Sequence, residues 1–173
     1  MSDDALWRWP AHRLATAIRS GAISAREAVA SSLARVADVN PRLNAVVDVM
    51  ADEALVAADA ADAARRHGDA LGVLHGVPVT VKVNVDTTGR ATTNGVVAYR
   101  DNIATEDSPV VANLRRAGAV VIARTNTPAF SVRWFTDNAL HGRTLNPWSK
   151  AHTPGGSSGG ASSAVAAGMG AIA

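Results

Sequence analysis

Cysteine is absent from the 173-residue sequence, which excludes disulfides, a thiolate nucleophile and a zinc–thiolate site. Aromatic residues make up only 4% of the chain, and its hydrophobic share of 47% relies on alanine. Large side chains that could fill a thick core are therefore few. We expect part of the core to lie outside this sequence, and the four tryptophans to serve mainly as packing residues.

Long runs of like charge and long apolar runs are also missing. The 17 basic and 15 acidic residues are spread along the chain and give a formal net charge of +2. This distribution does not support a nucleic-acid-binding or membrane-binding surface. The beginning of the chain lacks the pattern of a signal peptide, and no stretch of 18 apolar residues occurs. We expect a soluble, cytoplasmic protein with neither a nucleic-acid nor a membrane partner.

Metal-ligand spacing is missing as well. The five histidines stand at positions 12, 67, 75, 141 and 152, without the short regular spacing that metal sites use. We therefore predict no metal and no other cofactor.

Hydrophobic periodicity predicts that residues 1–70 are mainly helical. A first helix is expected from Pro10 to Gly21. Residues 24–27 form a capping box for a second helix, which we expect to end at Asn40–Pro41. An alanine-rich third helix is expected from about residue 51 to residue 67, closed by Gly68.

Residues 71–173 have the pattern of an α/β core. Valine occupies every odd position from Val77 to Val85, which predicts a strand. A helix opens at Ser108–Pro109 and closes at Gly118, and residues 119–123 form the continuous apolar run of a strand buried on both faces. A strand, a helix and a strand in this order indicate an α/β sheet.

A glycine–serine loop at residues 155–160 admits several interpretations. A flexible linker is disfavoured because both flanks have ordered patterns. A phosphate-binding loop is disfavoured because no lysine follows the glycines. Residues 155–159 match the Gly-x-Ser-x-Gly nucleophile elbow, but that motif needs a strand before it and an acid and a histidine after it. The sequence provides neither.

Five segments in register resemble the amidase-signature family, and the resemblance covers nearly the whole chain. They are residues 76–82, 117–126, 136–138, 146–148 and 153–160. The resemblance implies a mixed central sheet flanked by helices. It also implies that residues 1–173 are the N-terminal part of one amidase domain, with a mainly helical 1–70 and the start of the α/β core in 71–173. One departure is Val83, where many relatives carry an acidic residue; the alternation places it facing away from Lys82.

By the same resemblance, Lys82 and Ser157 are the catalytic lysine and the serine that follows a cis peptide bond. Gly155, Gly156 and Ser158 would form the supporting loop. Composition does not distinguish two adjacent serines, so Ser158 is the competing candidate for the role of Ser157, although we favour it as a helix N-cap. The acylated serine of the family lies in a later Gly-Thr-Asp-x-Gly-Gly-Ser segment, so we expect a truncated chain that is inactive alone. A further segment, Thr136, Asp137 and Asn138, lines a substrate pocket or forms a polar turn.

The chemistry of amide cleavage suits these residues. It needs a nucleophile, a proton for the leaving nitrogen and donors for the oxyanion. A lysine moves protons only when neutral, and burial in a valine-rich strand would lower its pKa. An edge-strand or salt-bridged lysine is the competing interpretation of Lys82.

The predicted function is hydrolysis of a non-peptide carboxamide to a carboxylate and ammonia or amine, through an acyl-serine. The expected partner is a small-molecule amide, and a homodimer is one assembly that the resemblance allows. Two alternatives stay open: a truncated paralogue that binds a partner through an uncovered sheet edge, with apolar strand faces exposed, and the transamidating branch of the family.

Overall fold

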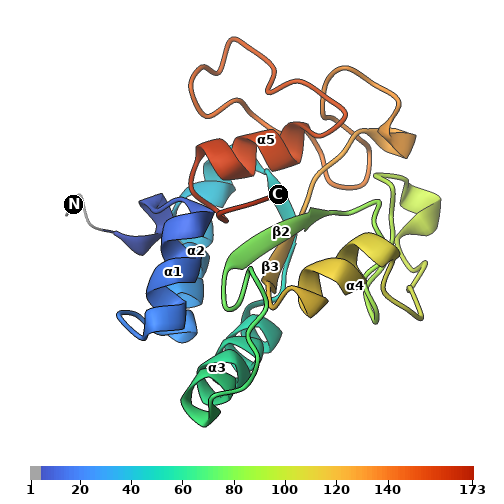
Figure 1. The fold of residues 1–173 in the computed structure, drawn as a ribbon. Coiled ribbons are helices and arrows are strands. Elements are labelled where there is room, and N and C mark those ends of the chain that lie inside the picture. Colours follow the sequence, from blue (N-terminus) through green and yellow to red (C-terminus); the bar gives the residue numbers. More distant parts are fainter. Residues whose placement is uncertain (1–4) are drawn as a thin grey trace.

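The structure is a computed structural model that describes residues 5–173. Its elements run in the order η1 (Leu6–Arg8), α1 (Ala11–Ser20), α2 (Ala25–Leu43), β1 (Val46–Val49), α3 (Ala51–His67), β2 (Pro78–Lys82), η2 (Val97–Tyr99), α4 (Pro109–Arg116), β3 (Val120–Thr125), η3 (Ala129–Ser131) and α5 (Gly159–Ala166). Figure 1 shows α5 above the strands, α3 below them and α4 beside them.

The sheet is mixed, with the strand order β1-β3-β2. β2 and β3 are parallel and are joined through α4, whereas β1 pairs with β3 in the antiparallel sense. Every residue of the central strand β3 is buried, which confirms the buried strand predicted from its apolar run. The α/β fold class with a mixed sheet is likewise confirmed.

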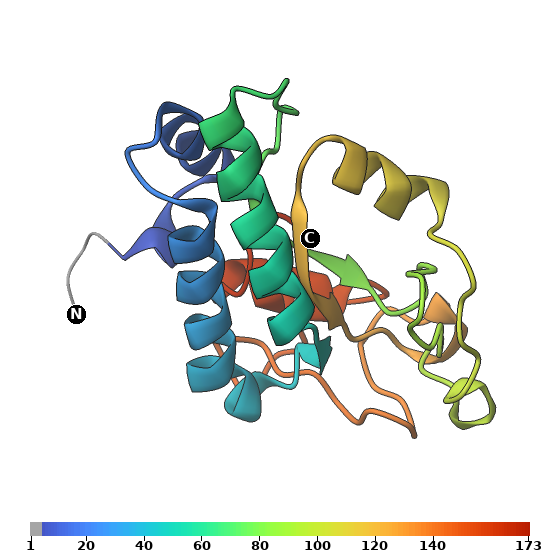
Figure 2. The ribbon, with the colours of Figure 1, turned by 90° about the horizontal axis from the view of Figure 1, so that it is seen from below.

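Helix α5 can lie close to the strands because its first turn consists of small residues. A Cβ atom on Gly160 would stand only 2.4 Å from the carbonyl oxygen of Asn126, just beyond β3. On another side of the sheet, α2 and α3 run next to each other, and Figure 2 shows this pair from below. The methyl side chains of Ala54 and Ala58 on α3 are buried, so this alanine-rich helix packs closely on that face.

Two predicted boundaries were wrong. Helix α2 continues through Pro41 and ends at Leu43, with Asn44 in the left-handed conformation. Proline removes only one amide from the last turn, and the side chain of Asn40 accepts hydrogen bonds from the amides of Ala45 and Val46. The helix therefore ends at Leu43, later than the end at Asn40–Pro41 that the proline predicted.

The predicted strand at residues 77–85 is also shorter than expected. β2 ends at Lys82, because the amide of Val85 turns back to the carbonyl of Lys82 at 3.0 Å. Beside its free edge, the amide of Thr80 donates to the carbonyl of Ile172 at 2.9 Å. Residues 77–81 are all buried, so the alternation of valines does not mark a strand with one face toward solvent.

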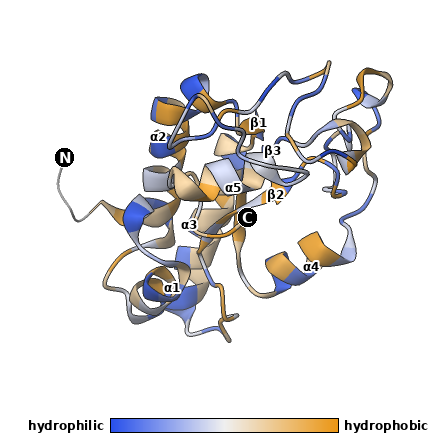
Figure 3. Ribbon diagram, turned by 90° about the horizontal axis from the view of Figure 1, so that it is seen from above, coloured by the Kyte–Doolittle hydropathy of each residue, from blue (hydrophilic) through white to orange (hydrophobic). Residues whose placement is uncertain are grey.

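Large apolar side chains are exposed on several kinds of element. Val49 on β1, Val56 on α3 and Val110 on α4 are exposed, as are several side chains of the loops. Figure 3 shows hydrophobic and hydrophilic residues mixed along the loops. Trp134 is 88% exposed and Trp148 is 83% exposed, so the expectation that the tryptophans serve mainly as packing residues does not hold for these two. None of the helices in residues 5–173 combines the length and the apolar character that a membrane crossing requires.

Candidate active site

The carboxyl ends of β2 and β3 form one polar edge of the sheet. In the parallel register, Lys82 at the end of β2 lies opposite Thr125 at the end of β3. Thr125, Asn126 and Thr127 follow each other there, and none of them is exposed to solvent. In open α/β sheets this edge is where ligands bind, because the chain leaves the strands and its side chains turn outward.

Lys82 is half-buried, and its ammonium group points at the glycine–serine loop. Its Nζ donates to Ser157 Oγ at 2.9 Å and lies 3.3 Å from Ser158 Oγ. Burial removes water from the amine and so lowers the pKa of Lys82 below that of a free lysine. Among residues 5–173 no carboxylate forms an ion pair with it, so the salt-bridged interpretation is not supported by the contacts.

A buried arginine holds the chain that follows Lys82. Arg124 is 1% exposed, and its guanidinium donates to the carbonyls of Val83 at 3.2 Å and Val85 at 3.1 Å. A third hydrogen bond, of 2.6 Å, reaches the carbonyl of Ala91. These carbonyl dipoles offset part of the cost of burying the charge, although Arg124 Nε is buried without a hydrogen-bond partner among residues 5–173. They also fix the turn that ends β2 at Lys82.

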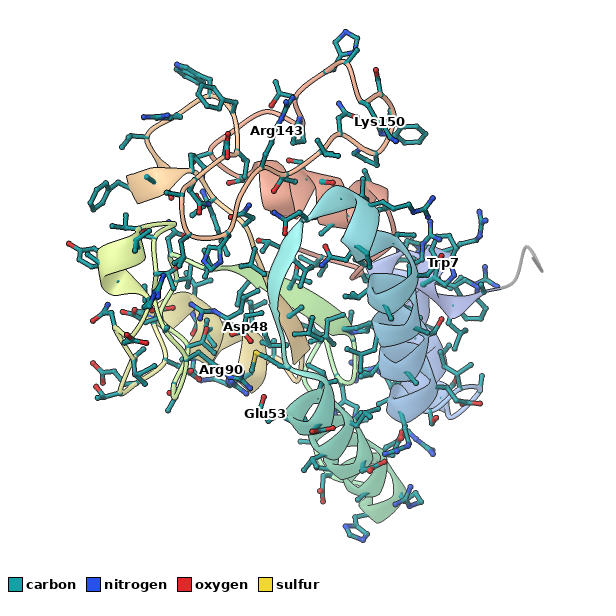
Figure 4. All side chains as sticks on the ribbon, turned by 180° about the vertical axis from the view of Figure 1, so that it is seen from behind. Trp7, Asp48, Glu53, Arg90, Arg143 and Lys150 are labelled. Carbon is teal, nitrogen blue, oxygen red and sulfur yellow. The ribbon has the colours of Figure 1, made fainter. Side chains whose placement is uncertain are left out.

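Charged side chains from β1, α3 and the loop at Arg90 form ion pairs with one another. Arg90 pairs with Asp48 on β1 at 3.1 Å and also with Glu53 on α3, and Figure 4 shows the three side chains converging. Arg124 lies 3.7 Å from the same Asp48. Through Arg124, which also binds the carbonyls of Val83 and Val85, this cluster is linked to the turn after Lys82.

The glycine–serine loop passes very close to residues 133–136. The peptide bond between Gly156 and Ser157 is cis. A Cβ atom on Gly156 would lie 2.5 Å from the carbonyl oxygen of Arg133 and 2.6 Å from the amide of Phe135. Only glycine fits at this approach, which explains physically why the loop needs a residue without a side chain.

Thr136 holds the loop from both sides of Ser157. Thr136 is buried, with 1% of the residue exposed. Its hydroxyl donates to the carbonyl of Gly155 at 3.1 Å and accepts from the amide of Gly159 at 3.0 Å. Thr136 therefore satisfies a free amide at the start of α5, the role that the sequence had suggested for Ser158. Ser158 does occupy the N-cap position, but its side chain makes no capping bond and faces Lys82 instead. The predicted N-cap position is therefore correct, but the hydroxyl of Ser158 does not supply the capping bond.

Asn138 and Asp137, the other residues of the predicted pocket segment, differ in burial. Asn138 is buried and donates to Asn126 Oδ1 at 2.8 Å and to the carbonyl of Thr127 at 2.7 Å, so it braces the polar edge. Asp137 is exposed. His141 lies behind this segment, where burial and, secondarily, the positive charge of Arg124 lower its pKa.

Two residues at the polar edge were missed by the sequence reasoning. Thr127 Oγ1 donates to the carbonyl of Ser157 at 3.3 Å and lies 2.8 Å from Ser131 Oγ. Ser131 Oγ in turn accepts from the side-chain Nδ2 of Asn84 at 3.1 Å, and both Phe130 and Ser131 adopt left-handed conformations. The available signal was the polar run 125–127 directly after a buried apolar strand, because such residues fall at the carboxyl edge of a parallel sheet.

An apolar hollow begins at Ser158 and follows α5. It has a volume of about 390 Å³ and is lined by Ser158, Ala161, Ser162, Val165, Ala166 and Ala173. Among residues 5–173 there is no cluster of three or more side chains that could hold a metal ion. The site thus consists of one amine of lowered pKa, two hydroxyls within its reach and a neighbouring apolar surface.

The sequence profile of the family described as Amidase matches residues 27–173, which is most of the chain. The chain belongs to the amidase family. The matched residues include both β2, which ends at Lys82, and the glycine–serine loop.

The relatives of this amidase-family chain are longer proteins. It is 62% identical to an indoleacetamide hydrolase of Bradyrhizobium diazoefficiens, over 97% of this chain and 32% of the relative. It is 42% identical to one of the subunits of the glutamyl-tRNA(Gln) amidotransferase of a Synechococcus strain, over 87% of this chain and 31% of the relative. A bacterial aryl acylamidase of the amidase-signature family superposes with a TM-score of 0.90 at 32% identity, over 94% of this chain and 34% of that structure. The chain thus spans about a third of the length of each.

Proposed function

We propose that the whole protein to which this chain belongs is an amidase that hydrolyses an aryl-substituted carboxamide through an acyl-serine intermediate. Lys82 and Ser157 carry protons in this reaction, and the acylated serine lies outside residues 1–173. The observation that carries the proposal is the 2.9 Å contact between Lys82 Nζ and Ser157 Oγ, made by an amine whose pKa is lowered by burial.

The proposed proton path follows from this contact. When the nucleophilic serine attacks the amide carbonyl, its proton passes to Ser157 Oγ, and the proton of Ser157 passes to neutral Lys82 Nζ. The path then runs in reverse, and the leaving nitrogen takes the proton as the C–N bond breaks. Water hydrolyses the acyl-serine by the same route. A lysine can start this sequence only while neutral, which the burial of Lys82 favours.

The substrate class rests on similarity and on the surface beside Ser158. The 62% identical relative is an indoleacetamide hydrolase, and a structural neighbour is an aryl acylamidase. The hollow along α5 offers alanine and valine side chains, which suit an apolar acyl group better than a charged one. An aryl acetamide is therefore the first substrate to test.

The test uses the full-length protein with an aryl acetamide and follows the release of ammonia. Lys82→Met and Ser157→Ala should each lower kcat by roughly 100-fold or more, since positioned proton transfer contributes 10²–10⁴-fold. Ser20→Ala, an exposed serine at the end of α1, is the matched control and should keep the parent rate. Full activity in the Lys82→Met variant would refute the proposed role.

A second candidate function is transamidation, because one relative, 42% identical, belongs to an amidotransferase. Such an enzyme releases ammonia from glutamine in the service of a tRNA-linked acceptor. Hydrolysis of an aryl acetamide by the purified protein, with no tRNA and no second protein present, would decide for the first function. Ammonia release from glutamine alone would favour the second.

A further inference from the structure

A cavity of about 580 Å³ lies at the C-terminal end of α5, at the opposite end of that helix from Ser158. Helix α5 has eight residues and is therefore about 12 Å long. The cavity opens between η1, the second half of α2 and the loop at residues 145–150. Figure 4 shows Trp7 and Lys150 on this side of the molecule, away from the Asp48–Arg90–Glu53 cluster.

The charged side chains that line this cavity all carry the same sign. They are Arg8, Arg35, Arg42 and Lys150, and no aspartate or glutamate is among the lining residues. Arg35 pairs with Asp38 at 3.0 Å and donates to the carbonyl of Ala167 at 2.8 Å. Within residues 5–173 the other three form no ion pair with a carboxylate. Like charges gathered around a concave surface create a field that favours an anion.

Two indole rings complete the cavity, and they differ in exposure. Trp7 is held in place, because its ring packs against Gly168 and carries the guanidinium groups of Arg8 and Arg35 at 4.5 and 4.1 Å from its centroid. Trp148 on the opposite loop is 83% exposed, so its ring is available for stacking. The combination of a free indole with unpaired cations suits a planar ring that bears a negative charge.

We propose that this cavity is a second binding site that takes a small aromatic carboxylate. The carboxylate would receive charge-assisted hydrogen bonds from Arg42 and Lys150, and the ring would stack on Trp148. The volume lies within the range of small-molecule sites, roughly 300–1,000 Å³. An inorganic anion would leave the indole unused, and a neutral amide would leave the cations unpaired.

This site is independent of the proposed hydrolysis, although an aryl carboxylate is also the acid that such a reaction would release. Ser157 and Ser158 lie at the N-terminal end of α5 and the cavity lies at its C-terminal end, but the apolar hollow that begins at Ser158 extends to Ala166, which also lines the cavity. Arg35 connects the cavity to that helix through the Ala167 carbonyl. The test must therefore separate binding in the cavity from binding of a product near Lys82.

The experiment titrates the full-length protein with phenylacetate in a calorimeter and follows tryptophan fluorescence. The double variant Arg42→Gln, Lys150→Gln removes two exposed cations of the cavity. Arg143→Gln is the matched control, because Arg143 is an exposed arginine of a neighbouring loop that does not line the cavity. Lys82→Met removes the amine of the candidate active site. Inorganic phosphate and phenylacetamide serve as comparison ligands, and phenylacetamide is titrated into the Lys82→Met variant so that it is not hydrolysed to phenylacetate.

We expect phenylacetate to bind at least tenfold more weakly to the double variant and to Trp148→Ala, but unchanged to Arg143→Gln and Lys82→Met. A charge-assisted hydrogen bond contributes roughly that factor. Equal binding to the parent and the double variant, no binding to the parent, or binding lost only with Lys82→Met would overturn the proposal. Phosphate or phenylacetamide bound as tightly as phenylacetate would overturn the assigned ligand class. Unchanged melting temperatures of the variants ensure that the losses are local.

Discussion

Lys82 and Ser157 are 75 positions apart in the chain, yet Lys82 Nζ and Ser157 Oγ lie 2.9 Å from each other. The contact depends on where β2 ends, on a loop in which Gly156 has no side chain, and on Thr136, which binds that loop at both ends. Each of these supports can be changed separately, so the geometry of the pair can be tested from several directions.

The pH dependence of catalysis should report the neutral form of Lys82. A protonated lysine cannot accept a proton, so kcat/KM of the full-length protein should rise with pH as Lys82 loses its proton. Because burial lowers its pKa, the midpoint of this rise should lie below the value of 10.5 for an ordinary lysine. A pH–rate profile from about pH 5 to pH 10 measures it. A midpoint that stays in place in a Lys82→Arg variant with residual activity would assign the titration to another group.

The free energy of unfolding should depend on pH through the protonation of Lys82. Between the lowered pKa and 10.5 the unfolded chain keeps the proton that the folded chain has lost, so the free energy of unfolding should rise with pH in this window. Below the lowered pKa the folded protein retains a partly buried charge, and Lys82→Met should be more stable than the parent there. Urea unfolding at several pH values checks both points. An identical pH dependence in parent and variant would contradict the assignment.

Thr136 should matter for turnover more than for substrate binding. Thr136→Val keeps the shape of the side chain but removes the donor to Gly155 and the acceptor for Gly159. We expect a loss of about 1–3 kcal/mol of stability from the buried groups left without partners. We also expect a lower kcat with KM nearly unchanged, because Ser157 would lose its fixed position. Thr136→Ser should restore most of both, and failure of that rescue would show that the methyl packing matters instead.

Gly156 should tolerate no side chain. In Gly156→Ala the new methyl group would meet the backbone of residues 133–135 at 2.5–2.8 Å, so the loop must move and the Lys82–Ser157 contact must lengthen. We expect most activity to be lost while secondary structure by circular dichroism is retained. Gly68→Ala is the comparison, since that glycine has open space around it but a positive φ. It should lower the melting temperature without a comparable loss of rate.

Arg124 should be irreplaceable by lysine. Its guanidinium reaches three backbone carbonyls in fixed directions, which a single ammonium group cannot reproduce from the same position. Arg124→Lys should therefore cost about 3 kcal/mol or more, as expected when a buried charge loses its partners. Chemical denaturation measures the change. A cost below about 1 kcal/mol would mean that the turn after β2 is held by other contacts.

Local rules predicted most elements correctly, and the errors have physical causes. The capping box at Ser24 and the serine cap at Ser108 are both present, because these signals act within a few residues. The rule that a helix ends before Pro41 was wrong, because Asn40 offers side-chain bonds that hold a later exit. The valine alternation overestimated β2, because a strand's length is set by its partners rather than by its own pattern.

The sequence by itself determined the family, the order of the elements and the candidacy of Lys82 and Ser157, since these rest on motifs and on short-range patterns. Only the tertiary structure decided that Thr136 caps α5 in place of Ser158, that Thr127 and Ser131 support the serine loop, and that four cations share one cavity with two tryptophans. These relationships join residues from separate segments. Hydrogen bonds and charge interactions form between residues that are close in space. Contacts between distant segments therefore cannot be read from positions along the chain, because they exist only after packing has brought those segments together.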